Sequence, residues 1–222
     1  YYNLKGICYY LLNRESECLE YWLKTEKIAK IDNDTNFLLR INNNIAIVYS
    51  TTGREKEALK IFTDQKKIYE TKKDTGGIIT SSINISTLIK NNDSIVLLLN
   101  NALDLAISMD RPSSFTNIYA NLAGTYLDTN SKKTFSLKKA KACLDSLILY
   151  AKEQSDVESK ILYYGTISEY YILKDQYNLA LKNAKKGAEL SKQMTGLTSP
   201  ELLSKLYEIQ KKLKNYKKAN LY

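Results

Sequence analysis

The sequence predicts an all-α fold, a right-handed α-solenoid of about six antiparallel helix pairs whose terminal pairs are incomplete. Three observations predict it. The 222 residues include only 8 Gly and 2 Pro, too few for the many tight turns of a sheet protein of this size. Apolar residues make up 44% of the chain, which is enough to build a core. A pattern of small, aromatic and turn residues recurs along the chain at a nearly constant interval.

The pattern is clearest in the segment NNNIAIVYSTTGREKEALKIF, which ends at Phe62. Ala46 and Ala58 are small residues at the positions where two antiparallel helices would cross most closely, which allows ridges to pack into grooves. Tyr49 and Phe62 would fill the wider spaces beside this crossing. Gly53 would end the first helix in a left-handed conformation that costs other residue types energy. The segment therefore predicts one helix–turn–helix unit.

Five further segments fit the pattern, and the small residue of each second helix recurs at intervals of 37 to 45 residues. These small-slot residues are Cys18, Ala58, Ile95, Ala140, Ala180 and Ala219. Because a lone helix pair cannot bury both of its faces, neighbouring pairs are expected to stack. We expect a single domain over residues 1–222, with repeats at approximately 1–33, 36–73, 76–109, 112–153, 157–194 and 199–222, the last one truncated.

The turn positions extend the pattern to the other units. The turn position that Gly53 occupies is taken in other units by Asn13, Asp175 and Lys214. Asn tolerates the left-handed conformation that this position requires. The third unit is looser: Ile83 takes the place of Ala46, and the residues KNND at 90–93 are predicted to form the turn. In the fourth unit the polar segment DTNSKKT delays the start of the second helix.

This pattern resembles the tetratricopeptide repeat (TPR) family over nearly the whole chain. The usual TPR unit has about 34 residues, and the longer units here imply longer helices and connecting loops. The sequence is also similar to the sensor regions of Bacteroidetes-type signalling proteins. Three features carry this resemblance: the long units, the segment LDSLILYAKE and the final segment LYEIQKKLKNYKKANLY. That resemblance implies a TPR array that precedes a membrane helix and a histidine kinase or helix-turn-helix output domain.

Both ends of the sequence fall inside the helical pattern. The first residues, YYNLKGICYY, have neither the basic start nor the cleavage site of a signal peptide, and no apolar run approaches the ~20 residues of a membrane span. We therefore expect the sequence to be part of a longer chain, with any anchor or output domain outside it. The compartment stays open: periplasmic or membrane-flanking for a sensor, and cytoplasmic otherwise.

The residue types argue against catalysis. The chain has no His, which removes His-based triads, His metal ligands and most general bases at neutral pH. The 3 Cys have no CxxC spacing, and Cys18 is expected to be a small core residue. The run Asp32-Asn33-Asp34 lacks the length and following residues of a calcium loop and is expected to be a loop and helix cap. We expect no enzyme activity, no metal and no cofactor.

The formal net charge of +9 comes almost entirely from Lys. The densest basic run is KLYEIQKKLKNYKK, which contains Lys205, Lys211, Lys212, Lys214, Lys217 and Lys218. An electrostatic patch for nucleic acid is one interpretation of this run, and a solvated helix face is the favoured one. The 18 Tyr pose a similar choice, and inter-helix packing is favoured over a ligand cage because Tyr9, Tyr49, Tyr126 and Tyr171 share one repeat position.

The TPR resemblance implies a concave surface formed by the first helix of each pair, where extended peptides bind. The helical phase assigns to this candidate groove Arg40, Asn43, Ile47, Ser50, Thr80, Asn84, Asn117 and Glu169, and also Thr87, Ala120, Gly124, Gly165 and Ile172. An Asn amide both donates and accepts hydrogen bonds, which suits a peptide backbone. Solvation of an exposed helix face explains the same residues, and the sequence does not decide between the two.

The sequence predicts a non-enzymatic module that binds a protein or peptide, as the sensing or scaffolding part of a bacterial signalling protein. Four alternatives stay open: a free-standing TPR adaptor, a module that self-assembles into a homodimer through its end repeats, a nucleic-acid-linked regulator that uses the Lys-rich helix, and a pheromone-peptide receptor of the kind found in Gram-positive bacteria. Nucleic acid is disfavoured for this fragment because Arg is scarce. Membrane contact is expected only through segments outside it.

Overall fold

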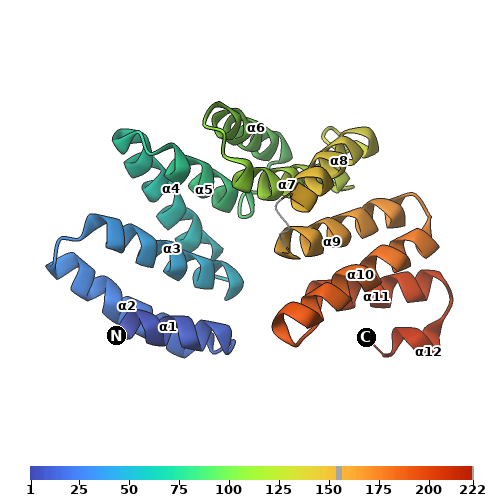
Figure 1. The fold of residues 1–222 in the computed structure, drawn as a ribbon, viewed down its shortest axis with the longest axis horizontal. Coiled ribbons are helices and arrows are strands. Elements are labelled where there is room, and N and C mark those ends of the chain that lie inside the picture. The colour runs from blue at the N-terminus through green and yellow to red at the C-terminus, as the bar shows by residue number, and fades with distance from the viewer. Residues whose placement is uncertain (154–156, 222) are drawn as a thin grey trace. The chain divides into compact units, whose positions relative to one another are not determined.

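The computed structural model describes residues 1–153 and 157–221, and within these residues all regular structure is helical (Figure 1). The chain forms two compact units, Tyr1–Ile89 and Lys90–Tyr222. None of the described helices is long and apolar enough to cross a lipid bilayer. The expectation of a single domain with the stated repeat boundaries stays a prediction.

The first unit contains five helices, each packed against the next along the chain. They are α1 (Tyr2–Leu11), α2 (Glu15–Ile31), α3 (Thr35–Thr51), α4 (Glu55–Lys72) and α5 (Thr75–Ser86). One core cluster joins α2 to α3, with Trp22 and Ile45 among its buried residues. Tyr9 and Tyr49 pack against this cluster from α1 and α3 and are half-buried, as the packing interpretation predicts.

The second unit follows the same pairing. Its elements are α6 (Asn92–Ser108), the short 3-10 helix η1 (Pro112–Ser114), α7 (Phe115–Leu127), α8 (Leu137–Glu153), α9 (Val157–Leu173), α10 (Tyr177–Thr195), α11 (Pro200–Lys212) and α12 (Tyr216–Ala219). A core cluster joins α10 to α11 through Ala180, Ala184, Leu202 and Leu206. The last pair is incomplete, because α12 has only four residues within the part of the chain that the structure describes.

The small-slot residues lie where the pattern predicts. Cys18, Ala58, Ala140 and Ala180 are completely buried, Ala219 is 1% exposed and Ile95 is 8% exposed. A buried residue therefore recurs at the fourth position of every second helix, and it is Ala or Cys in every case except Ile95. This burial agrees with the packing role that the sequence pattern predicts for these positions.

The predicted turn positions are also confirmed. Gly53 has φ +79°, and Asn13, Asp175 and Lys214 have φ between 54° and 57°, so all four adopt the left-handed conformation. An added Cβ at Gly53 would meet no atom within 4 Å, so the backbone conformation alone explains why glycine suits this position. The expected caps are present as well: Asp34 accepts a hydrogen bond from the Phe37 N–H, and Ser199 caps α11 ahead of Pro200.

The third predicted helix pair departs from the prediction. The helix α5 ends at Ser86, and Asn91 caps α6, so Asn92 and Asp93 are helical rather than part of a turn. Ile83 is half-buried, whereas Ser82 and Ser86 take the buried positions. The hydroxyls of Ser86 and Thr87 donate to backbone carbonyls three residues earlier, a local bonding that competes with helix continuation.

Candidate functional site

The structure brings together two of the predicted groove residues across the first helices of adjacent pairs. Asn84 Nδ2 on α5 donates to Asn43 Oδ1 on α3 at 3.0 Å, and both side chains are half-buried. Among the described residues, the Asn43 Nδ2 and Asn84 Oδ1 atoms have no side-chain hydrogen bond within the protein. The pair therefore keeps one donor group and one acceptor group free, which are the two groups that a peptide backbone needs.

The neighbouring groove candidates of the first unit share these helix faces by spacing. Arg40 and Ile47 lie three residues before and four after Asn43, and Arg40 is exposed whereas Ile47 is half-buried. Ser50 is half-buried, and its hydroxyl donates to the Ile47 carbonyl at 2.7 Å, which leaves its lone pairs free to accept. Thr80 lies four residues before Asn84 and is exposed. The surface around the amide pair, which we call the Asn43–Asn84 face, thus combines polar groups with one apolar side chain.

The candidates in the second unit are less uniform. Asn117 and Gly124 on α7 are exposed, as a groove position requires. Three others are buried: Ala120 is 5% and Ile172 is 7% exposed, and an added Cβ at Gly165 would lie 3.8 Å from Leu202 on α11. These buried positions pack helices together and present nothing to a ligand. Helical phase alone placed them on the groove because it ignores the neighbouring helix that covers them.

Glu169 lies half-buried on α9 beside the charged side chains of α11. Burial raises the pKa of its carboxyl above the ordinary value of 4.5, Lys205 lowers it, and Glu208 and Glu201 raise it further. Lys205 is itself only 16% exposed and donates to Glu201 Oε1 at 2.7 Å. The Lys205 ammonium group therefore acts on both Glu201 and Glu169. Since Glu201 and Glu208 are both negative, Glu169 faces more negative than positive charge.

We expect Glu169→Gln to stabilise the protein at neutral pH. A folded-state pKa above the unfolded value contributes stability that is fully present below pH 4.5 and is lost as the pH rises through the folded-state pKa. Gln stays neutral, so the gain should grow as the pH rises from below 4.5 to neutrality. Urea unfolding of both proteins across this range measures it, with Glu189→Gln on the exposed surface of α10 as the matched control. A gain that is the same at every pH would contradict the assignment.

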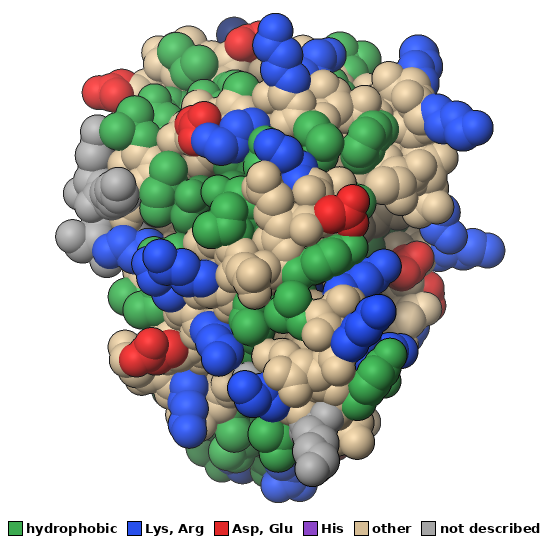
Figure 2. Space-filling model, turned by 90° about the vertical axis from the view of Figure 1, so that its right-hand side faces the viewer, with side chains coloured by type: hydrophobic (Ala, Val, Ile, Leu, Met, Phe, Trp, Pro, Cys, Tyr) green, Lys and Arg blue, Asp and Glu red, His purple; other side chains and the backbone are tan. Residues whose placement is uncertain are grey.

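The Lys-rich run near the C-terminus largely matches the solvated-face interpretation. Lys211, Lys212, Lys214 and Lys218 are exposed, whereas Lys205 is mostly covered and paired. The side chain of Lys217 lies outside the described residues. Basic residues are unevenly divided between the units: residues 1–89 carry 13 Lys and Arg against 11 Asp and Glu, and residues 90–222 carry 20 against 13. Figure 2 shows Lys and Arg outnumbering acidic side chains on the face over helices of the second unit.

The three cysteines lie in different environments. Cys8 is exposed, Cys18 is buried and Cys143 is half-buried, and all three are free thiols. Burial raises the pKa of Cys18 and of Cys143 to about 11, so both thiols stay protonated at neutral pH. Within the described residues, no cluster of three His, Cys, Asp or Glu side chains could hold a metal ion.

Comparison with known proteins identifies the fold. No family model and no curated protein matches the sequence. Among solved structures, the chain is similar to NprR, whose crystal structure was determined in complex with its cognate peptide NprX. The TM-score is 0.70 at 16% sequence identity over 98% of this chain, which spans 62% of the NprR chain. The likeness shows the fold. The protein is an all-helical solenoid of the TPR type, as the sequence predicts.

Proposed function

We propose that this protein is a non-enzymatic peptide-binding module that holds an extended peptide on the Asn43–Asn84 face. The amide pair carries the proposal. Its remaining donor on Asn43 and acceptor on Asn84 match the carbonyl and N–H that an extended backbone presents. The exposed Arg40 and Thr80 and the half-buried Ile47 would contact peptide side chains beside it.

The mutual hydrogen bond of the pair is important because it orients both amides before any ligand arrives. A free Asn side chain loses rotamer freedom when it binds, whereas these two are already constrained by each other. The likeness to NprR, which was crystallised with a peptide, supports a peptide as the ligand. We further propose that the module serves as the sensing or scaffolding part of a bacterial signalling protein, in which peptide binding shifts the equilibrium of an attached output domain.

We expect a selection of short random peptides against the full chain to yield binders that depend on the amide pair. Asn43→Ala and Asn84→Ala should each weaken binding about three- to tenfold, because each removes a net hydrogen-bond contribution of about 0.5–1.5 kcal/mol. The double variant should lose less binding free energy than the sum of the two single losses, because the two side chains bond each other and are not independent. Calorimetric titration of the selected peptides measures these affinities.

Asn42→Ala is the matched control, because Asn42 is also half-buried on α3 but adjacent helical residues do not share a face. It should leave the affinity unchanged. Circular dichroism should show that all variants keep their helical content. Peptides that bind every variant equally well would show that the Asn43–Asn84 face is not the binding surface.

A further inference from the structure

A cavity of about 430 Å³ that is widely open to solvent lies between α8 and the C-terminal end of α9 in the second unit, and none of its lining residues belongs to the Asn43–Asn84 face. Leu137, Lys141, Ala142 and Asp145 line it from α8, Tyr170 lines it from α9, and Lys174 lines it from the turn that follows α9. Its volume falls within the range of small-molecule sites, about 300–1,000 Å³. The cavity is therefore large enough for a compact organic ligand.

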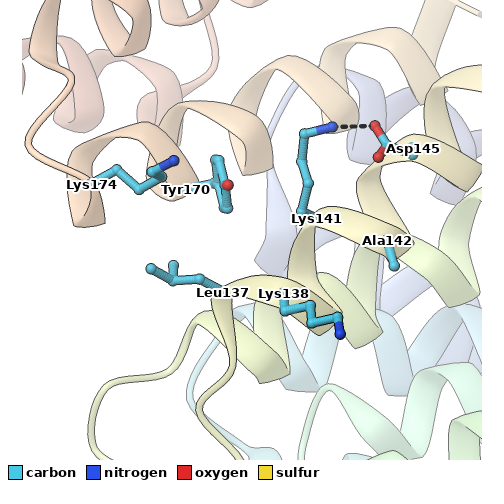
Figure 3. Close-up of a pocket in the computed structure, with 7 residues that line it drawn as sticks. All are labelled: Leu137, Lys138, Lys141, Ala142, Asp145, Tyr170 and Lys174. Atoms are coloured by element: carbon cyan, nitrogen blue, oxygen red, sulfur yellow. Dashed lines mark hydrogen bonds and ion pairs between the residues drawn. The ribbon is translucent and has the colours of Figure 1, made fainter.

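The charged groups of this cavity are predominantly basic. In Figure 3 the Lys174 and Lys141 side chains lie on either side of Tyr170, whereas the ammonium group of Lys138 points away from them. The Lys174 Nζ atom lies 5.5 Å from the centroid of the Tyr170 ring, a cation–π contact that holds the ammonium group at the cavity edge. The single carboxylate, Asp145, is bound to Lys141 one helical turn away.

The Lys141–Asp145 ion pair does not close the site. Both side chains are substantially exposed, 41% for Lys141 and 61% for Asp145, and exposed pairs of this kind are weak. An anion that enters the cavity can therefore bind the Lys141 ammonium group in place of Asp145, whose carboxylate is then hydrated. The second ammonium group, on Lys174, has no carboxylate partner among the described residues.

The remaining lining is apolar. Tyr170 is 8% exposed as a residue, and Leu137 and Ala142 contribute aliphatic surface beside it. We propose that this cavity binds a small organic anion whose acidic group, a carboxylate or a phosphate, lies between Lys141 and Lys174 while its apolar body packs against Tyr170 and Leu137. The proposal does not use Asn43 or Asn84, so it stands or falls independently of peptide binding there.

The test uses phenyl phosphate, benzoate and inorganic phosphate as probes, each titrated into the full chain and followed by the backbone NMR signals of Tyr170 and Lys174. Phenyl phosphate or benzoate should shift both signals, and the tighter of the two identifies the preferred acidic group. Lys174→Gln should weaken the binding about tenfold, the effect of losing one charge-assisted contact. Lys141→Gln should weaken it at least as much, because it also leaves Asp145 free to repel the anion.

Lys182→Gln is the matched control, because it removes one exposed positive charge from α10 without touching the cavity. It should leave the affinity unchanged. Three results would overturn the proposal: no shift of either signal, an equal loss in the control, or inorganic phosphate binding as tightly as phenyl phosphate. The last would show that the apolar wall contributes nothing.

Discussion

Replacing Trp22 with Ala should lower the free energy of unfolding by about 3–5 kcal/mol, the usual cost of removing a large buried aromatic side chain. Trp22 is 3% exposed and belongs to the core cluster between α2 and α3. Its indole also reaches α1, where Nε1 donates to Asn3 Oδ1 at 3.2 Å and an added Cβ at Gly6 would lie 2.4 Å from Nε1. One side chain therefore holds three helices together.

Such a loss is a large part of the 5–15 kcal/mol that stabilises a typical domain. Urea unfolding followed by circular dichroism measures it, because Trp22 is the only Trp and its fluorescence disappears with the substitution. Leu11→Ala on the same unit is the control, since Leu11 is 75% exposed and should cost less than about 0.5 kcal/mol. A Trp22→Ala cost as small as that of the control would show that the packing of α1 onto α2 is not as described.

Replacing Ala180 with Leu should cost about 1–3 kcal/mol, although it adds apolar surface to a buried position. Ala180 is completely buried in a cluster that includes Leu202, Leu206 and Ile209 of α11. A larger side chain there must displace buried neighbours, because Ala180 has no exposed surface. The substitution tests the central idea of the repeat, namely that a small residue is required where the helices cross.

Ala142→Leu provides the matched control, because it makes the same change at an exposed position of α8. Its effect on stability should stay within about 0.5 kcal/mol. Chemical unfolding of both variants against the parent protein gives the comparison. Equal effects at the two positions would contradict the small-slot explanation of the sequence period.

The repeat could be predicted from the sequence because its determinants are local. Gly53 at the turn and the small residue Ala58 lie five residues apart. The same separation between the turn residue and the small residue recurs in other units. The early end of α5 could not be predicted in this way. The helical period of the surrounding apolar residues does not reveal where α5 ends, although Ser86 and Thr87, whose hydroxyls bond their own backbone, lie at this end.

The candidate site was only partly accessible from the sequence. Helical phase assigned Asn43 and Asn84 to one candidate groove, but their hydrogen bond joins residues 41 positions apart and depends on how α3 and α5 are aligned. The cavity between α8 and α9 was missed altogether. Lys141 and Lys174 resemble ordinary surface charges in the sequence, and only the folded chain places them around Tyr170.

The central claim is that a peptide binds through the amide pair on α3 and α5. The most direct measurement follows the side-chain amide NMR signals of the full chain while a peptide obtained by library selection is added. We predict that the signals of Asn43 and Asn84 shift together and saturate with the peptide, while that of Asn42 does not move. Saturable binding that shifts signals elsewhere and leaves both Asn43 and Asn84 unchanged would contradict the claim.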